Sequence, residues 1–169
     1  KDMGFTLMHE HLANSSAGLP QVFPELMDSS LARDAGIHAL DDAYSEGIRS
    51  YVDVTTMDLG RDMPLIRSIA ENSKVNVILA TGLWLDIPRA IINGVAADQL
   101  AESFIKEIEI GIEGTSIKAG IIKVATSEEG VTVGNELVLR AASRAAIRTG
   151  VPISTHTAAI EKVGNDQIE

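Results

Sequence analysis

The chain has 169 residues, of which 45% are apolar, so it can bury a substantial hydrophobic core and is expected to form one domain. Its 14 basic and 24 acidic residues give a formal net charge of −10, which opposes binding to nucleic acid. The absence of cysteine excludes disulfides and thiolate metal sites, and leaves imidazole, carboxylate and amine-derived groups as metal ligands.

Short β-branched runs alternate with longer helical stretches, a pattern typical of βα units around a parallel sheet. In chain order, the expected strands cover residues 5–9, 50–55, 76–81, 119–124 and 152–156. The expected helices cover residues 30–45, 64–71, 97–112 and 133–149.

Turn and cap residues support these boundaries. Asp62, followed by Met63 and Pro64, is typical of a helix start, and Gly47 and Gly150 follow expected helices where a left-handed cap would stand. The longest segment without a regular pattern, residues 83–95, follows the third expected strand. Because binding loops often follow the strands of such folds, this segment is a candidate substrate loop.

Two histidines stand at the end of the first expected strand. His9 and His11 flank Glu10, and the two-residue period of a strand directs both imidazoles to one face. The pair could chelate one metal ion. The alternative is two exposed or hydrogen-bonded histidines without a metal.

Lys123 lies inside the fourth expected strand, where its charged form would lose its hydration. One interpretation is a buried ion pair, or a side chain that reaches the end of the strand. The other is a lowered pKa that leaves a free amine able to take up carbon dioxide, giving a carbamate that can bridge two cations.

The fifth expected strand ends at His156, which would therefore share the carboxyl edge of the sheet with His9, His11 and Lys123. The joint placement of these groups favours a metal site. Asp53, in the second strand, could orient a ligating imidazole or be a buried carboxylate without a metal role. His38 falls within the first long helix and is interpreted as a surface or packing residue.

Several segments together resemble the bacterial phosphotriesterase family of the amidohydrolase superfamily. They are GFTLMHEH (4–11), VDVT (52–55), GRD (60–62), ATGLW (80–84), AGIIKVA (119–125), GVP (150–152) and THT (155–157). The resemblance runs nearly from end to end. It implies an α/β fold of the (β/α)8 TIM-barrel type, of which residues 1–169 would be the N-terminal part, an incomplete barrel of about five strands.

The same resemblance implies a site with two divalent metal ions, zinc being favoured. His9 and His11 would bind the more buried ion, His156 the other, and carboxylated Lys123 would bridge them. In this family a metal-bridging hydroxide attacks phosphorus or a carbonyl carbon. Trp84 corresponds to an aromatic residue of the leaving-group pocket, and Leu59 and Leu85 match neighbouring pocket positions.

The family pattern also requires a histidine on the sixth strand and an aspartate on the eighth, which lie beyond Glu169. A barrel of this kind takes typically about 250 residues, and five strands would leave two unpaired edges. The alternatives are a truncated chain, an engineered fragment, or completion by a second chain.

The resemblance implies hydrolysis of small-molecule esters by the parent protein. Organophosphate triesters are one substrate class and lactones the alternative, with Trp84 favouring the phosphotriesterase branch because the lactonase-like branch more often has tyrosine there. A non-catalytic fragment or binding module is a different hypothesis.

Neither a membrane span nor a nucleic-acid partner is expected, and the intact protein is expected to be a homodimer. No apolar run approaches the roughly 20 residues that a membrane helix needs. The sequence starts at Lys1, so a removed leader is not excluded, although the cytoplasm is favoured.

Overall fold

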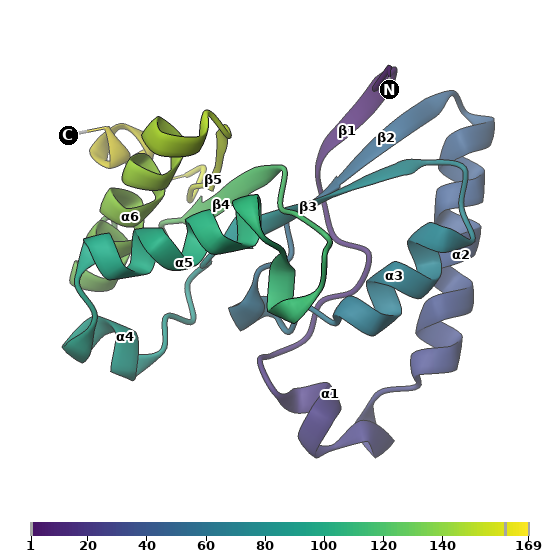
Figure 1. Ribbon diagram of the computed structural model, residues 1–169, viewed down its shortest axis with the longest axis horizontal. Coiled ribbons are helices and arrows are strands. Elements are labelled where there is room, and N and C mark those ends of the chain that lie inside the picture. The colour runs from purple at the N-terminus through teal and green to yellow at the C-terminus, as the bar shows by residue number, and fades with distance from the viewer. Residues whose placement is uncertain (1, 161, 169) are drawn as a thin grey trace. The chain divides into compact units, whose positions relative to one another are not determined.

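A computed structural model of the chain describes residues 2–160 and 162–168 (Figure 1). The chain divides into two compact units, and strand β3 (Asn76–Gly82) runs from the first into the second. The first unit comprises Lys1–Thr55 and Leu59–Leu79, and the second comprises Thr56–Asp58 and Ala80–Glu169.

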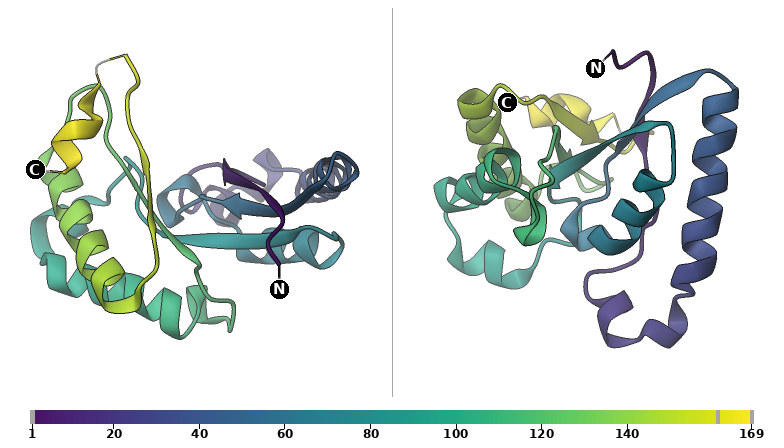
Figure 2. Two further views of the ribbon diagram at one scale, coloured as in Figure 1. Left: turned by 90° about the horizontal axis from the view of Figure 1, so that it is seen from above. Right: turned by 45° about the vertical axis from the view of Figure 1, so that its right-hand side comes forward.

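The first unit pairs β1 with β2 and β2 with the first half of β3, all in parallel. Its other long elements are helices α2 and α3, which pack against each other (Figure 2). The bounds are β1 Phe5–Glu10, α1 Leu19–Val22, η1 Pro24–Leu26, α2 Ser29–Ser45, β2 Ile48–Asp53 and α3 Met63–Glu71.

Local sequence explains both long helices of this unit. The Asp28 carboxylate accepts the backbone N–H groups of Ser30 and Leu31 and so caps α2, while Asp62 accepts the N–H of Leu65 at 3.0 Å and caps α3. Both helices then bury apolar side chains in one core. This core contains Leu40, Ile69 and Val75.

The second unit pairs the end of β3 with β4 and β4 with β5, again in parallel. Helices α5 and α6 pack together over these strands (Figure 1). The bounds are α4 Arg89–Gly94, α5 Ala97–Glu109, η3 Ile112–Gly114, β4 Ile121–Ala125, α6 Val133–Thr149, β5 Ile153–His156 and η4 Val163–Gln167, with η2 Met57–Leu59 at the junction of the units.

The strand order is β1-β2-β3-β4-β5, and helical segments connect successive strands. This is the expected α/β fold, an incomplete (β/α) barrel. Within the described ranges, no helix is long and apolar enough to cross a membrane.

Most sequence-based boundaries hold within a few residues, and two details differ. Asp62 caps α3 and Gly150 ends α6 with φ +75°, as the cap residues predict. Segment 83–95 was expected to lack regular structure, but residues 89–94 form α4. The expected third helix ends at Glu109 rather than residue 112, because a short 3-10 turn, η3, follows Gly111.

Candidate metal and substrate site

His9 and His11 lie close together at the carboxyl end of β1. Their ring centroids are 6.2 Å apart with an interplanar angle of 69°. The pairing of β1 with β2 shifts register between Leu7 and Glu10, so the strand is irregular where the histidines stand. The two imidazoles are neighbours, and their joint binding of a metal ion stays a prediction.

The Thr55 side chain forms a hydrogen bond with His11. Its Oγ1 lies 2.9 Å from Nδ1 of the imidazole, a hydrogen bond that restricts the orientation of the ring. Asp53 in turn accepts the backbone N–H of Thr55 through Oδ1 at 2.9 Å. Asp53 thus acts on His11 through Thr55, a residue that the sequence analysis did not single out.

The Asp53 carboxyl group is buried, with 1% of the residue exposed. Loss of hydration raises its pKa, although hydrogen bonds from Thr55 oppose this shift. Its second oxygen, Oδ2, has no hydrogen-bond partner among the described residues. An unsatisfied buried carboxylate oxygen is costly unless a ligand or solvent molecule completes it.

Lys123 lies at the centre of β4, in which every residue is buried. Only 1% of Lys123 is exposed, and burial lowers the pKa of its amine to about 8. A lowered pKa is one of the two interpretations that the sequence offers for a lysine in an apolar strand. Burial thus favours the neutral form of the Lys123 amine more than a position on the protein surface would.

Gly82 allows β3 to approach the backbone of Lys123. It pairs with Lys123 in the sheet, and the next residue, Leu83, donates its N–H to the Lys123 carbonyl at 3.1 Å. Gly82 has φ +113°, and a Cβ atom there would collide with that carbonyl oxygen. Gly82, in the motif at residues 80–84, therefore allows a backbone conformation and a close approach to β4 that a larger residue would not.

His156 ends β5 opposite Ala125 of β4. Partial burial lowers the pKa of its imidazole, and the positive charge of Lys123 adds to this effect. The Trp84 ring meets the His156 ring edge to face, with centroids 5.9 Å apart at 70°. The second unit thus brings together His156, a candidate metal ligand, and Trp84, the candidate aromatic residue of the leaving-group pocket.

Asp58 holds the start of the loop that carries Trp84. Its two carboxylate oxygens accept the backbone N–H of Trp84 at 3.1 and 2.9 Å, and Oδ1 also accepts the Thr56 hydroxyl at 2.5 Å. Only 2% of Asp58 is exposed. Sequence reasoning missed this residue, because nothing in the local pattern indicates which distant backbone group a buried carboxylate binds.

An open cavity of about 520 Å³ lies at the carboxyl ends of β4 and β5. Leu85 and His156 are both in its wall, and a role of Leu85 in substrate binding stays a prediction. Leu59 belongs to the first unit, where its carbonyl accepts the Ser15 N–H at 2.8 Å. Its role in a substrate pocket stays a prediction.

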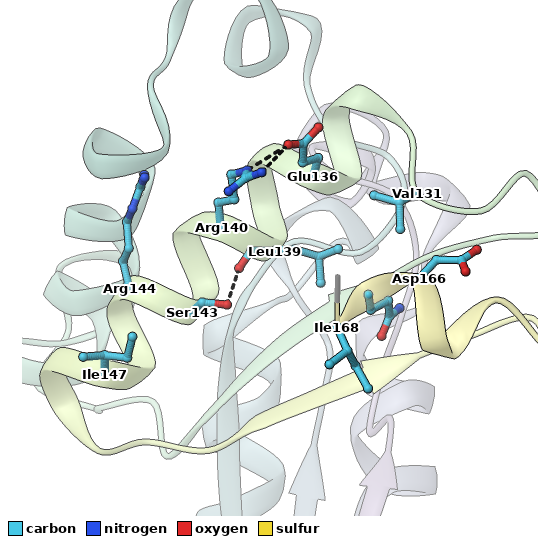
Figure 3. Close-up of a pocket in the computed structure, with 10 residues that line it drawn as sticks. Val131, Glu136, Leu139, Arg140, Ser143, Arg144, Ile147, Asp166 and Ile168 are labelled. Carbon is cyan, nitrogen blue, oxygen red and sulfur yellow. Dashed lines mark hydrogen bonds and ion pairs between the residues drawn. The ribbon is translucent and has the colours of Figure 1, made fainter.

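A second hollow, of about 390 Å³, lies along α6 and contains none of the candidate ligands (Figure 3). Arg140 in its wall pairs with Glu136 at 2.7 Å, one turn apart on the helix. Apolar, polar and charged side chains all contribute to its lining. Gln167, whose amide donates to the His156 carbonyl at the end of β5, is also in its wall.

The candidate ligands divide evenly between the units, with two histidines in the first and Lys123 and His156 in the second. In the described part of the chain, no group of three or more histidine, aspartate or glutamate side chains is arranged to hold a metal ion. His38 is exposed on α2, as expected for a surface residue.

Comparison with known proteins decides the family. The model of the phosphotriesterase family matches residues 1–169. The chain belongs to the phosphotriesterase family. The family assignment agrees with the parallel sheet and with the motifs at residues 4–11 and 119–125.

Three curated relatives illustrate the similarity. A phosphotriesterase homology protein of Mycobacterium tuberculosis is 41% identical over 175 residues, covering 98% of this chain and 54% of the relative. An aryldialkylphosphatase of Saccharolobus solfataricus is 37% identical over 169 residues, covering 99% and 54%. A phosphotriesterase homology protein of Escherichia coli is 35% identical over 158 residues, covering 91% and 52%. The chain thus spans about half the length of these phosphotriesterase-family relatives.

Proposed function

We propose that the intact protein is a hydrolase that uses two divalent metal ions to cleave organophosphate triesters or related small-molecule esters. The family match and the similarity to an aryldialkylphosphatase support this proposal. The observation that carries it is the burial of Lys123 in β4, adjacent to the strand that ends at His156. An ammonium is unfavourable there, whereas a carbamate would be useful if cations bound it.

The proposed ligands are His9, His11, Lys123 as its carbamate, and His156. Imidazole nitrogens and carboxylate-type oxygens suit zinc, and the chain has no cysteine to offer instead. When bound, two such cations would lower the pKa of a water molecule and polarise the phosphoryl or carbonyl oxygen of an ester. The ligands beyond these four would come from the rest of the intact protein.

The chain's own residues would orient and shield this chemistry. Thr55 restricts the rotation of the His11 ring, and Asp53 holds Thr55. The half-buried ring of Trp84, next to His156, would offer an apolar wall to the leaving group of the ester. Leu85 would extend that wall along the cavity at the strand ends.

The test combines metal analysis with turnover of paraoxon and of a lactone by the intact protein. We expect two bound metal ions per chain and hydrolysis of the phosphotriester. Incubation with ¹³C-labelled bicarbonate should give a carbamate signal that Lys123→Met lacks and that disappears when the metal is removed. A fully active enzyme carrying Lys123→Met would contradict the proposal.

Lactone hydrolysis is the second candidate, because it would use the same centre. Trp84 favours the phosphotriesterase branch, so we expect faster turnover of paraoxon than of the lactone. A non-catalytic binding module is the third reading. Metal-free, inactive intact protein would favour that module. Homodimerisation of the intact protein and the lack of a nucleic-acid partner are further proposals.

A further inference from the structure

One side chain of the segment that follows β5 forms hydrogen bonds with the end of that strand. Gln167, the last residue of η4, donates from Nε2 to Thr126 Oγ1 at 2.6 Å and to the His156 carbonyl at 3.2 Å. Its Oε1 accepts the Thr155 hydroxyl at 2.6 Å. Both ends of the amide are therefore used, in one compact network.

The chemistry of the partners determines which way the amide faces. The His156 carbonyl can only accept a hydrogen bond, so the nitrogen of Gln167 has to face it. The opposite orientation would set the amide oxygen against the carbonyl oxygen. The Thr155 hydroxyl then has an acceptor in Oε1, and the Thr126 hydroxyl oxygen has a donor in Nε2.

The network lies where backbone pairing between β4 and β5 ends. The His156 carbonyl accepts the N–H of Thr126 at 3.0 Å and the Thr155 hydroxyl at 3.2 Å, and Gln167 adds a further donor to the same oxygen. Thr126 itself is fully buried and immediately follows the last residue of β4. Gln167 thus connects the ends of both strands, one of which carries Lys123 and the other His156.

We propose that Gln167 is a positioning residue for His156, which fixes the carboxyl end of β5 against that of β4. Its importance for catalysis rests on the proposed function, whereas its effect on the position of His156 does not. Residues that orient a metal-ligating histidine typically change metal affinity by about 10- to 100-fold when they are replaced. We therefore expect Gln167 to act on metal binding without contacting the metal.

Gln167→Glu is the most informative variant, because it retains the size and the oxygen acceptor but removes the donor. It would place a carboxylate oxygen against the His156 carbonyl. Asn165→Asp is the matched control: it makes the same change from amide to acid on an exposed residue of the same η4 segment. Any effect of added negative charge in this segment would appear in both variants.

Trp84 provides a readout in the metal-free protein. It is the single tryptophan of the sequence, and its ring contacts that of His156, so its fluorescence depends on where His156 lies. We expect Gln167→Glu to change Trp84 emission in the same direction as His156→Ala and by at least half as much. Asn165→Asp should have wild-type emission. Wild-type emission from Gln167→Glu, with His156→Ala altered, would overturn the proposal.

Zinc titration of the same proteins gives an independent readout. Affinity should fall at least tenfold in Gln167→Glu and stay at the wild-type value in Asn165→Asp. Equal zinc affinity in Gln167→Glu and the wild type would contradict positioning even if emission changed. If this chain bound no zinc, the emission comparison would still decide the role of Gln167, and the proposed function would be decided by the metal analysis of the intact protein.

Circular dichroism separates this effect from misfolding. If Gln167→Glu does not fold, Gln167→Met replaces it, because methionine has a similar length and removes both the donor and the acceptor of the amide. Thr155→Val would not serve, because the Thr155 hydroxyl also donates to the His156 carbonyl at 3.2 Å. Gln167→Met should shift Trp84 emission in the direction of His156→Ala, and no shift in this variant would reject the proposal.

Discussion

The Trp84 ring stands edge to face against His156, with centroids 5.9 Å apart. This contact joins the loop after β3 to the end of β5, two segments far apart in the sequence. The Asp58 carboxylate accepts the backbone N–H of Trp84, and the Gln167 amide donates to the backbone carbonyl of His156. These hydrogen bonds come from different residues, so the roles of Asp58 and Gln167 can be tested separately.

Asp58→Ala should destabilise the protein by about 2 kcal/mol, because it leaves the Trp84 N–H and the Thr56 hydroxyl without their charged acceptor. Urea unfolding measures this loss, and a change in Trp84 emission should accompany it. Asp86→Asn, an exposed change in the same loop, is the control and should leave both properties nearly unchanged. Wild-type stability in Asp58→Ala would show that these hydrogen bonds contribute little.

Gly82→Ala should cost at least about 2 kcal/mol, because alanine strongly disfavours φ +113° and its Cβ would meet the Lys123 carbonyl. The matched change is Gly94→Ala at the end of α4, where an added Cβ meets no atom within 4 Å. That variant should be as stable as the wild type or slightly more stable. Thermal unfolding of the pair tests the prediction, and equal midpoints would refute it.

The stability provided by the Asp28 cap should depend on pH. Hydrogen bonds from the Ser30 hydroxyl and from the N–H of Leu31 hold the pKa of Asp28 below 3.8. A lowered pKa in the folded state means that the carboxylate stabilises the protein above pH 3.8, and that this contribution is lost as the pH falls through the folded-state pKa.

Asp28→Asn separates this effect from the titration of other carboxyl groups, because asparagine also caps helices but does not ionise. The stability difference between wild type and Asp28→Asn should be constant above about pH 5 and should change in favour of the variant below it. Denaturant unfolding at a series of pH values measures the difference. A difference independent of pH down to the acid-unfolding region would count against the cap.

For the intact protein, His9→Ala and His156→Ala should each lower metal content and turnover together. His38→Ala should change neither, because His38 is exposed on α2. Metal analysis by mass spectrometry and a paraoxon assay provide the two measurements. Equal damage from His38→Ala and His9→Ala would show that the ligands are wrongly assigned.

Local and periodic features determined much of this protein from sequence alone. The alternation of strands and helices predicted the parallel α/β fold, and Asp62 and Gly150 predicted helix ends. Lys123 was predicted to be buried because its neighbours in the strand are apolar. These features depend on residues close together in the chain, or on the rule that parallel strands place their carboxyl ends at one edge.

Only the tertiary structure showed which polar groups meet. Thr55 beside His11, Asp58 beneath Trp84 and Gln167 at the end of β5 each act through a hydrogen bond to a residue distant in sequence. A polar residue in a loop has many potential partners, and no periodic pattern selects one of them. The packing of the backbone makes that choice, because it determines which buried donors and acceptors lie within reach of each other.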